Sequence, residues 1–126
     1  MRQRRVVIQW TDTAIRQLTK LPPKVRRGLW NKADALRECD DPRTAAKRLV
    51  GPLEGYYRIV YSRYRAIFSY QEEELANGET VLRILIRFVA VGIRKEGDKR
   101  DVYRFAMRLL KLGALDEPGS EQPEQS

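Results

Sequence analysis

Residues 56–70 read YYRIVYSRYRAIFSY, a stretch in which apolar and charged side chains alternate on both sides of Ser62-Arg63. Alternation with a period of two is typical of a strand with one buried face, so the stretch predicts two strands joined by a two-residue turn. Such a turn would place Val60 opposite Arg65, with Arg58 a diagonal neighbour of Arg65 on the same face. The opposite, core-facing side would carry Tyr57, Ile59, Tyr61, Tyr64, Ala66 and Phe68.

The segments that flank this hairpin predict further strands. Residues 6–9 are mostly β-branched and predict a first strand, and residues 81–91 alternate like the hairpin itself. Four glutamates between 72 and 79, with the turn signal Asn77-Gly78, predict a loop between the strands. The strand at 81–91 would expose Arg83 and Arg87. Its core face would carry Leu82, Ile84, Ile86, Phe88 and Ala90.

Apolar residues at helical spacing predict three helices. Residues 12–21 follow a possible N-cap at Thr11 or Asp12, and the prolines at 22–23 separate them from a second helix that ends near residue 40. A last helix would be capped by Asp98 or Asp101 and start close to Tyr103. Strands and helices in this order indicate an α+β fold, with a helical hairpin packed on an antiparallel sheet of about four strands.

The charge of the chain is distributed unevenly. Among its 126 residues 25 are basic, 18 of them arginine, and residues 1–112 carry all 25 against only 13 acidic side chains. Residues 1–112 are therefore expected to form one strongly basic domain, and residues 113–126 an acidic, disordered tail. A body with a balance of +12 favours a polyanionic partner, most readily a nucleic acid. No apolar run is long enough for a membrane helix and no secretory signal is readable, so a cytoplasmic protein is expected.

The absence of histidine restricts the possible chemistry. The chain contains no histidine and one cysteine, Cys39, which excludes Ser-His-Asp and Cys-His nucleophile systems and makes a zinc or cysteine-cluster site very unlikely. Catalysis would have to use arginine, lysine, tyrosine or carboxylates, with no metal or other cofactor. Cys39 is interpreted as a small buried apolar residue rather than a reactive thiol.

Three segments, in the order KRLVGPLEGYYRIVYSRYRAIF, VAVGIRK and DVYRFAMRLL, resemble the RelE/ParE superfamily of bacterial toxins. The similarity covers most of residues 5–110. Its most specific parts are residues 49–51, 64–65, 91–94 and 102–103. The resemblance to the RelE branch implies a ribosome-dependent endoribonuclease that cuts mRNA, held inactive by a cognate antitoxin, and it allows a heterotetramer of the two proteins.

The resemblance also assigns the candidate catalytic residues. The functional positions of the family fall on Arg58, Arg65, Arg94 and Tyr103. Two departures stand out: Val60 replaces a lysine of some members, and the link between Arg94 and Tyr103 is longer than usual. Lys99 or Arg100 in that link either substitutes for the missing lysine or is a solvated charge.

These side chains suit RNA cleavage without a metal, in which the 2′-hydroxyl attacks the adjacent phosphate and the 5′-oxygen leaves. Tyr103 is the one candidate base, helped by nearby guanidinium groups. Arg58 and Arg65 can contact the scissile phosphate through two hydrogen bonds each, and Arg94 would stabilise the leaving oxygen. Each of these residues could instead be an ordinary packed or solvated side chain.

Other basic residues are candidates for contacts with RNA phosphates: Lys47, Arg48, Arg83, Arg87, Lys95, Lys99 and Arg100. Two alternatives to the nuclease stay open. The ParE branch of the same fold inhibits DNA gyrase, and a third possibility is a nucleic-acid-binding module without catalysis. Because the ParE branch generally lacks the arginine and tyrosine of the nuclease set, the presence of both Arg94 and Tyr103 favours RNA cleavage.

Overall fold

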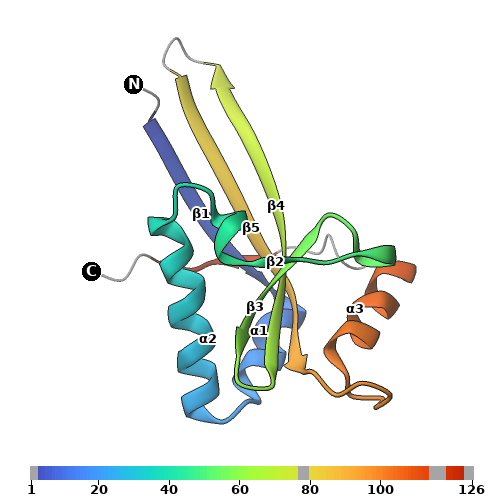
Figure 1. The fold of residues 1–126 in the computed structure, drawn as a ribbon. Coiled ribbons are helices and arrows are strands. Elements are labelled where there is room, and N and C mark those ends of the chain that lie inside the picture. The colour runs from blue at the N-terminus through green and yellow to red at the C-terminus, as the bar shows by residue number, and fades with distance from the viewer. Residues whose placement is uncertain (1–2, 77–79, 114–118, 124–126) are drawn as a thin grey trace.

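The fold is described from a computed structural model, which defines residues 3–76, 80–113 and 119–123. A twisted sheet separates two helical layers: α1 and α2 cover one face and α3 packs against the other (Figure 1). The α+β class predicted from the sequence is confirmed. The elements are β1 (Gln3–Thr11), α1 (Asp12–Thr19), α2 (Pro23–Ala35), η1 (Leu36–Glu38), η2 (Pro42–Ala45), β2 (Lys47–Arg48), η3 (Gly51–Leu53), β3 (Tyr56–Tyr61), β4 (Tyr64–Ala76), β5 (Thr80–Ile93), α3 (Val102–Lys111) and β6 (Gly119–Glu121).

The hairpin of β3 and β4 has the predicted register. Val60 pairs with Arg65, and Tyr61 pairs with Tyr64 across the turn. Ser62 takes a positive φ of 54°, which matches the twist that a two-residue turn between antiparallel strands requires. The core under α1 and α2 receives the predicted side chains Tyr57, Ile59, Tyr61, Tyr64, Ala66 and Phe68. The register of this stretch was therefore predictable from its alternation alone.

The sheet is larger than predicted and is not wholly antiparallel. The described residues form six strands in the order β2-β3-β4-β5-β1-β6, and β1 runs parallel to β5. The two extra strands, β2 and β6, are only two and three residues long, too short to show a period. The strand β4 also continues through Glu72 and Glu73, which were expected in a loop. The predicted turn at 77–78 lies outside the described residues.

A β-bulge changes which side of β5 faces the core. Phe68 pairs with Phe88 but its neighbour Ile67 pairs with Ala90, so Val89 has no direct partner. Beyond the bulge Ala90 turns away from the first core and Val91 enters it, contrary to the predicted alternation. The bulge thereby adds Ala90 to a second core beneath α3, which is formed by Leu49, Leu53, Ile67, Val89, Ala90, Val102 and Ala106.

The helices begin where the sequence predicted. The Thr11 hydroxyl accepts a hydrogen bond from the Ala14 amide at the start of α1, and Pro23 occupies the first position of α2. Asp101, rather than Asp98, caps α3. No helix in the described ranges is long and apolar enough to span a membrane.

The prediction of a disordered tail after residue 113 is wrong for residues 119–122. Strand β6 pairs with β1, and the Gln122 side chain is buried, accepting a hydrogen bond from Trp10 Nε1 at 2.6 Å and donating one to the Trp30 carbonyl at 3.2 Å. Arg37 donates to the Gln122 carbonyl. Composition alone concealed this contact, because a glutamine that meets Trp10, Trp30 and Arg37 in the fold resembles a solvated residue in the sequence.

Candidate active site

Asp101 organises the start of α3. Its carboxylate accepts hydrogen bonds from the Arg104 amide at 3.4 Å, the Lys95 amide at 2.7 Å and Arg94 Nη1 at 2.8 Å. The Asp101 side chain is 7% exposed, so its carboxylate has lost most of its contacts with water. These three hydrogen bonds take the place of those contacts. One residue therefore caps the helix, anchors the end of β5 and fixes the Arg94 guanidinium.

Arg94 lies over the ring of Tyr103. The guanidinium carbon is 4.8 Å from the ring centroid, within the range of a cation–π contact. The hydrogen bond to Asp101 raises the pKa of Arg94 above its ordinary value, so this group stays a cation. In the described part of the chain, nothing accepts a hydrogen bond from the Tyr103 hydroxyl.

The Arg94–Tyr103 pair borders a cavity of about 260 Å³ between η3 and α3. The remaining lining residues are Leu49, Val50, Pro52, Leu53 and Met107. Val50 and Met107 are among the exposed apolar side chains of the chain. An arginine and a phenol therefore face a largely apolar hollow that opens to solvent past Val50 and Met107.

The three candidate arginines form a diagonal row across the sheet. Arg58 pairs with Ile67, two residues from Arg65 on β4, and Arg65 pairs with Gly92, two residues from Arg94. With strands about 4.8 Å apart and a rise of about 3.3 Å per residue, each step of this row spans about 8 Å at the backbone. Arg65 is thus a neighbour of Arg94, whereas Arg58 lies about 16 Å away along the row.

Arg65 is held close to the hairpin turn. Its Nη1 donates hydrogen bonds to the carbonyls of Ser62 at 2.9 Å and Tyr64 at 3.0 Å. Its Nε is buried and has no partner among the described residues. A buried donor without an acceptor is costly, so this nitrogen is an energetic cost of holding Arg65 against the turn.

The link between Arg94 and Tyr103 folds into a compact turn. Asp98 accepts hydrogen bonds from the amide and side chain of Arg100, and its carboxylate lies 3.5 Å from Lys95 Nζ. The hydrogen bonds from Arg100 hold the pKa of Asp98 well below its ordinary value. Two of the three cations predicted to bind RNA here are therefore engaged within the turn, whereas Lys99 is exposed.

The other candidate RNA-binding residues divide into two groups. Lys47 pairs directly with Arg58 across β2 and β3 and extends the diagonal row at the sheet edge, whereas Arg48 pairs with Tyr57 and so points to the opposite face. Arg83 and Arg87 precede Arg94 by eleven and seven residues on β5, which places them about 36 and 23 Å away along the strand. Arg83 is ion-paired with Glu73 at 3.4 Å. These two do not join the site.

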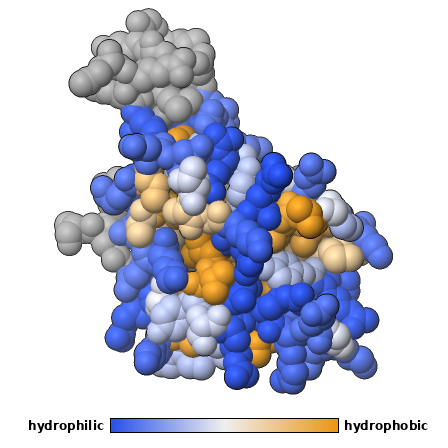
Figure 2. Space-filling model, viewed as in Figure 1, coloured by the Kyte–Doolittle hydropathy of each residue, from blue (hydrophilic) through white to orange (hydrophobic). Residues whose placement is uncertain are grey.

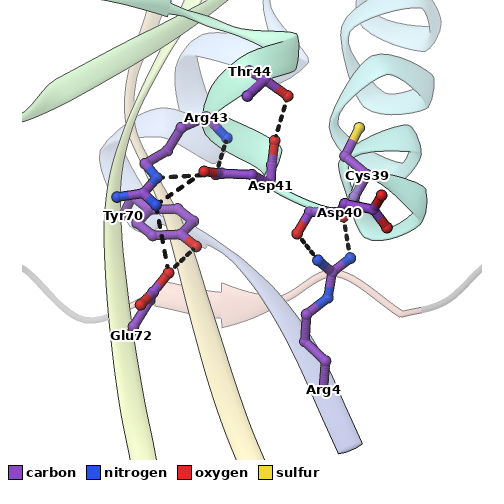
Figure 3. Close-up of polar contacts among 8 residues, drawn as sticks. All are labelled: Arg4, Cys39, Asp40, Asp41, Arg43, Thr44, Tyr70 and Glu72. Carbon is purple, nitrogen blue, oxygen red and sulfur yellow. Dashed lines mark hydrogen bonds and ion pairs between the residues drawn. The ribbon is translucent and has the colours of Figure 1, made fainter. Parts of the chain in front are cut away.

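A second arginine–tyrosine pair lies on the other side of the sheet (Figure 3). The Arg43 guanidinium carbon is 4.5 Å from the Tyr70 ring, and Arg43 also bonds to both carboxylate oxygens of Asp41 at 2.9 Å. The Tyr70 hydroxyl donates to Glu72 at 2.7 Å. Burial and this hydrogen bond raise the pKa of Tyr70 above its ordinary value. This cluster ties η2 to β4.

Sequence reasoning missed the residues that complete the site. Asp101 was predicted only as a helix cap, although an aspartate seven residues after an arginine at a strand end is a possible partner for it. The apolar wall from Leu49, Leu53 and Met107 could not be found, because its members come from segments more than 50 residues apart. No sequence pattern joins them.

Comparisons with known proteins add a structural likeness. No protein-family model matches the chain, and no curated protein matches it. The structure is similar to a chain of the crystal structure of the toxin–antitoxin complex RelBE2 from Mycobacterium tuberculosis, with 25% sequence identity and a TM-score of 0.45. The match covers 63% of this chain and 91% of that chain.

Proposed function

We propose that the chain is the toxin of a type II toxin–antitoxin system and that it acts in the cytoplasm as a ribosome-dependent mRNA endoribonuclease. The observation that carries the proposal is the contact between Arg94 and Tyr103, two residues that the family resemblance assigns to the reaction and that nine positions separate in the sequence. Arg65, the next arginine of the row, supports the same assignment by its position, because it pairs with Gly92, two residues before Arg94.

The proposed reaction needs no metal. Tyr103 acts as the base that takes the proton of the ribose 2′-hydroxyl, whose oxygen attacks the adjacent phosphorus as the bond to the 5′-oxygen breaks. Arg65 donates hydrogen bonds to the phosphate oxygens and offsets the charge of the five-coordinate intermediate. Arg94 stabilises the leaving 5′-oxygen, which takes its proton from water. The products are a 2′,3′-cyclic phosphate and a free 5′-hydroxyl.

The dependence on the ribosome has a physical reason in this proposal. Neither a phenol nor a guanidinium is a strong acid–base catalyst near neutral pH, so the rate must come largely from alignment of the 2′-oxygen with the leaving group. Ideal alignment can supply about 7–11 kcal/mol of the barrier. The ribosome would hold mRNA in that geometry, and a cognate antitoxin would block the cationic row, a strongly basic surface that an acidic segment can cover.

Controlled expression with mapping of transcript ends tests the proposal. The wild-type chain should arrest growth and leave discrete cuts in translated mRNA with 5′-hydroxyl ends, and Arg94→Gln should abolish both. Arg108→Gln is the matched control, because Arg108 lies 5.6 Å over the Phe105 ring on α3 but does not line the cavity. Intact transcripts with DNA-damage signalling would instead indicate a gyrase inhibitor, and the absence of toxicity would indicate a binding module.

A further inference from the structure

The outer side of α1, α2 and the loop between them carries charge of one sign. Residues 13–33 contain six cations and no acidic side chain, although the whole chain has 17 acidic residues. Five of the six cations are exposed and the sixth is half-buried. Figure 2 shows hydrophilic side chains along the outer edge of α2, at the left of the view. The cations of this α1–α2 surface are Arg16, Lys20, Lys24, Arg26, Arg27 and Lys32.

The positive charge of the α1–α2 surface is not compensated within the described part of the protein. None of its six cations forms an ion pair with another described residue. Arg26 donates a hydrogen bond to the Thr19 carbonyl at 3.2 Å, which links the two helices. Lys24 and Arg26 lie in the first turn of α2, where the helix dipole disfavours positive charge. Interactions within the fold therefore do not account for this charge, which favours an external anion as its partner.

The side chains of the α1–α2 surface favour phosphate groups over a protein partner. Protein interfaces are centred on apolar and aromatic side chains, and charged residues are depleted there. The exposed large apolar side chains of the described residues all lie in or next to η3 and α3, and none belongs to α1 or α2: they are Val50, Met107, Leu110 and Leu112. Phosphate groups, in contrast, require only cations and hydrogen-bond donors.

The aromatic residues favour a double helix over a single strand. Single-stranded nucleic acids bind in cationic grooves where aromatic rings stack on the bases. The one aromatic residue of α1 and α2 is Trp30, which stacks on the buried Trp10 at 5.5 Å. The bases of a duplex already stack on one another, so a duplex is recognised by its backbone and shape. Lys24 and Arg27 lie three positions apart on α2, about 5–6 Å from each other at Cβ, and can contact such a backbone together.

We infer that the α1–α2 surface binds the phosphate backbone of a nucleic-acid duplex. The helices α1 and α2 lie on the face of the sheet opposite α3 (Figure 1), so the duplex and the strand proposed to be cut at Arg94 would contact different sides of the protein. The inference goes beyond the proposed function, because duplex binding requires no cleavage. RNA and DNA duplexes share the backbone chemistry, and folded RNA of the ribosome is the source that the proposed function would supply.

Fluorescence anisotropy of a labelled duplex tests the inference. The probe is a 2′-O-methyl RNA duplex of about 16 base pairs, which cannot be cleaved by 2′-oxygen attack and is long enough for one domain to contact. The full chain is titrated at salt concentrations from about 50 to 200 mM. The triple variant Lys20→Gln/Lys24→Gln/Arg27→Gln should weaken binding about tenfold or more and reduce the salt slope by about 2–3, close to 0.9 for each lost duplex contact. A DNA duplex of the same sequence is the second arm: tighter binding of RNA identifies RNA as the source, and tighter binding of DNA identifies DNA.

A triple variant of α3 is the matched control. Arg104→Gln/Arg108→Gln/Lys111→Gln removes the same number of positive charges from the other side of the sheet and should weaken duplex binding less than about threefold. The two triple variants have equal net charge, so a difference between them locates the binding surface. Thermal unfolding is the second measurement: Lys24→Gln should not lower Tm, because it removes a positive charge from the first turn of α2.

Three results would overturn the inference: equal losses of binding in the two triple variants, no loss in the α1–α2 variant, or displacement of the duplex by a hexaglutamate peptide at equal charge concentration. The last result would indicate an acidic protein surface as the partner. The nuclease proposal is judged separately, because Arg94→Gln should bind the duplex like the wild type even though it cleaves nothing. A wild-type chain that cuts mRNA without binding the duplex would refute only this inference, and one that binds the duplex without cutting would refute only the nuclease.

Discussion

The molecule contains two arginine–tyrosine pairs of nearly equal geometry, with separations of 4.5 Å for Arg43–Tyr70 and 4.8 Å for Arg94–Tyr103. Their surroundings differ. Two carboxylates close the first pair: Asp41 holds the guanidinium and Glu72 takes the hydrogen bond of the phenol. In the second pair Asp101 holds the guanidinium from one side, and the ring borders an apolar cavity. The comparison teaches that residue type does not distinguish a structural clamp from the pair proposed to be reactive, whereas the partner of the phenol does.

Removal of the two phenol hydroxyl groups should give the largest contrast. Tyr103→Phe should lower cleavage of ribosome-bound mRNA by about 10²–10⁴-fold, the typical contribution of a general base. Tyr70→Phe should leave cleavage within about twofold, because its hydroxyl serves Glu72 alone. Primer extension on a translated message measures both. Similar losses of cleavage in the two variants would mean that the partner of the phenol does not determine which tyrosine takes part in the reaction.

The carboxylates of the two pairs should differ in their effect on stability. Asp101→Ala removes a helix cap and leaves Arg94 without its buried partner, so the free energy of unfolding should fall by about 2–4 kcal/mol. Asp41→Ala should cost less than about 1 kcal/mol, because the Asp41 side chain is 39% exposed and solvent screens its pair with Arg43. Urea unfolding of both variants gives the measurement. A larger loss of stability for Asp41→Ala than for Asp101→Ala would contradict the view that the buried carboxylate contributes more than the exposed one.

The smallest expected effect is a decrease in the free energy of unfolding at alkaline pH. The pKa of Tyr70 is raised in the folded state, so above the ordinary value of about 10 the unfolded chain loses this proton first. The unfolded state then binds fewer protons, and stability declines as the pH rises through that region. Tyr70→Phe should remove this part of the decline. Chemical unfolding of the wild type and variant between pH 8 and 11 tests the sign, which an equal decline in both proteins would contradict.

Sequence reasoning succeeded where the interacting residues are close together in the sequence and failed where they are far apart. The hairpin around Ser62-Arg63 was predictable because each side chain in it repeats the same two-residue alternation. The caps at Thr11 and Asp101 were likewise local. The bulge at Val89 was not predictable, since it depends on how Ile67 and Phe68 pair with a strand twenty residues later.

The candidate site was predictable only in part. The family resemblance named Arg94 and Tyr103, and the structure places them in contact. It also suggested that Arg58 converges with them, yet the register separates Arg58 from Arg94 by two strands. The α1–α2 surface was not recognised as a separate interface, because its cations are a minority of the 25 basic residues and only the fold shows which of them are exposed.

The burial of Gln122 beside Trp10 provides an optical reporter. Trp10 and Trp30 are the only tryptophans of the chain and their rings stack at 5.5 Å. The Gln122 side chain accepts a hydrogen bond from the Trp10 indole and donates one to the Trp30 backbone carbonyl. Detachment of the C-terminal strand would hydrate the buried Trp10 indole and shift its emission to longer wavelength. Intrinsic fluorescence can therefore follow the docking of the chain terminus in the unlabelled protein, independently of any event at the opposite sheet edge.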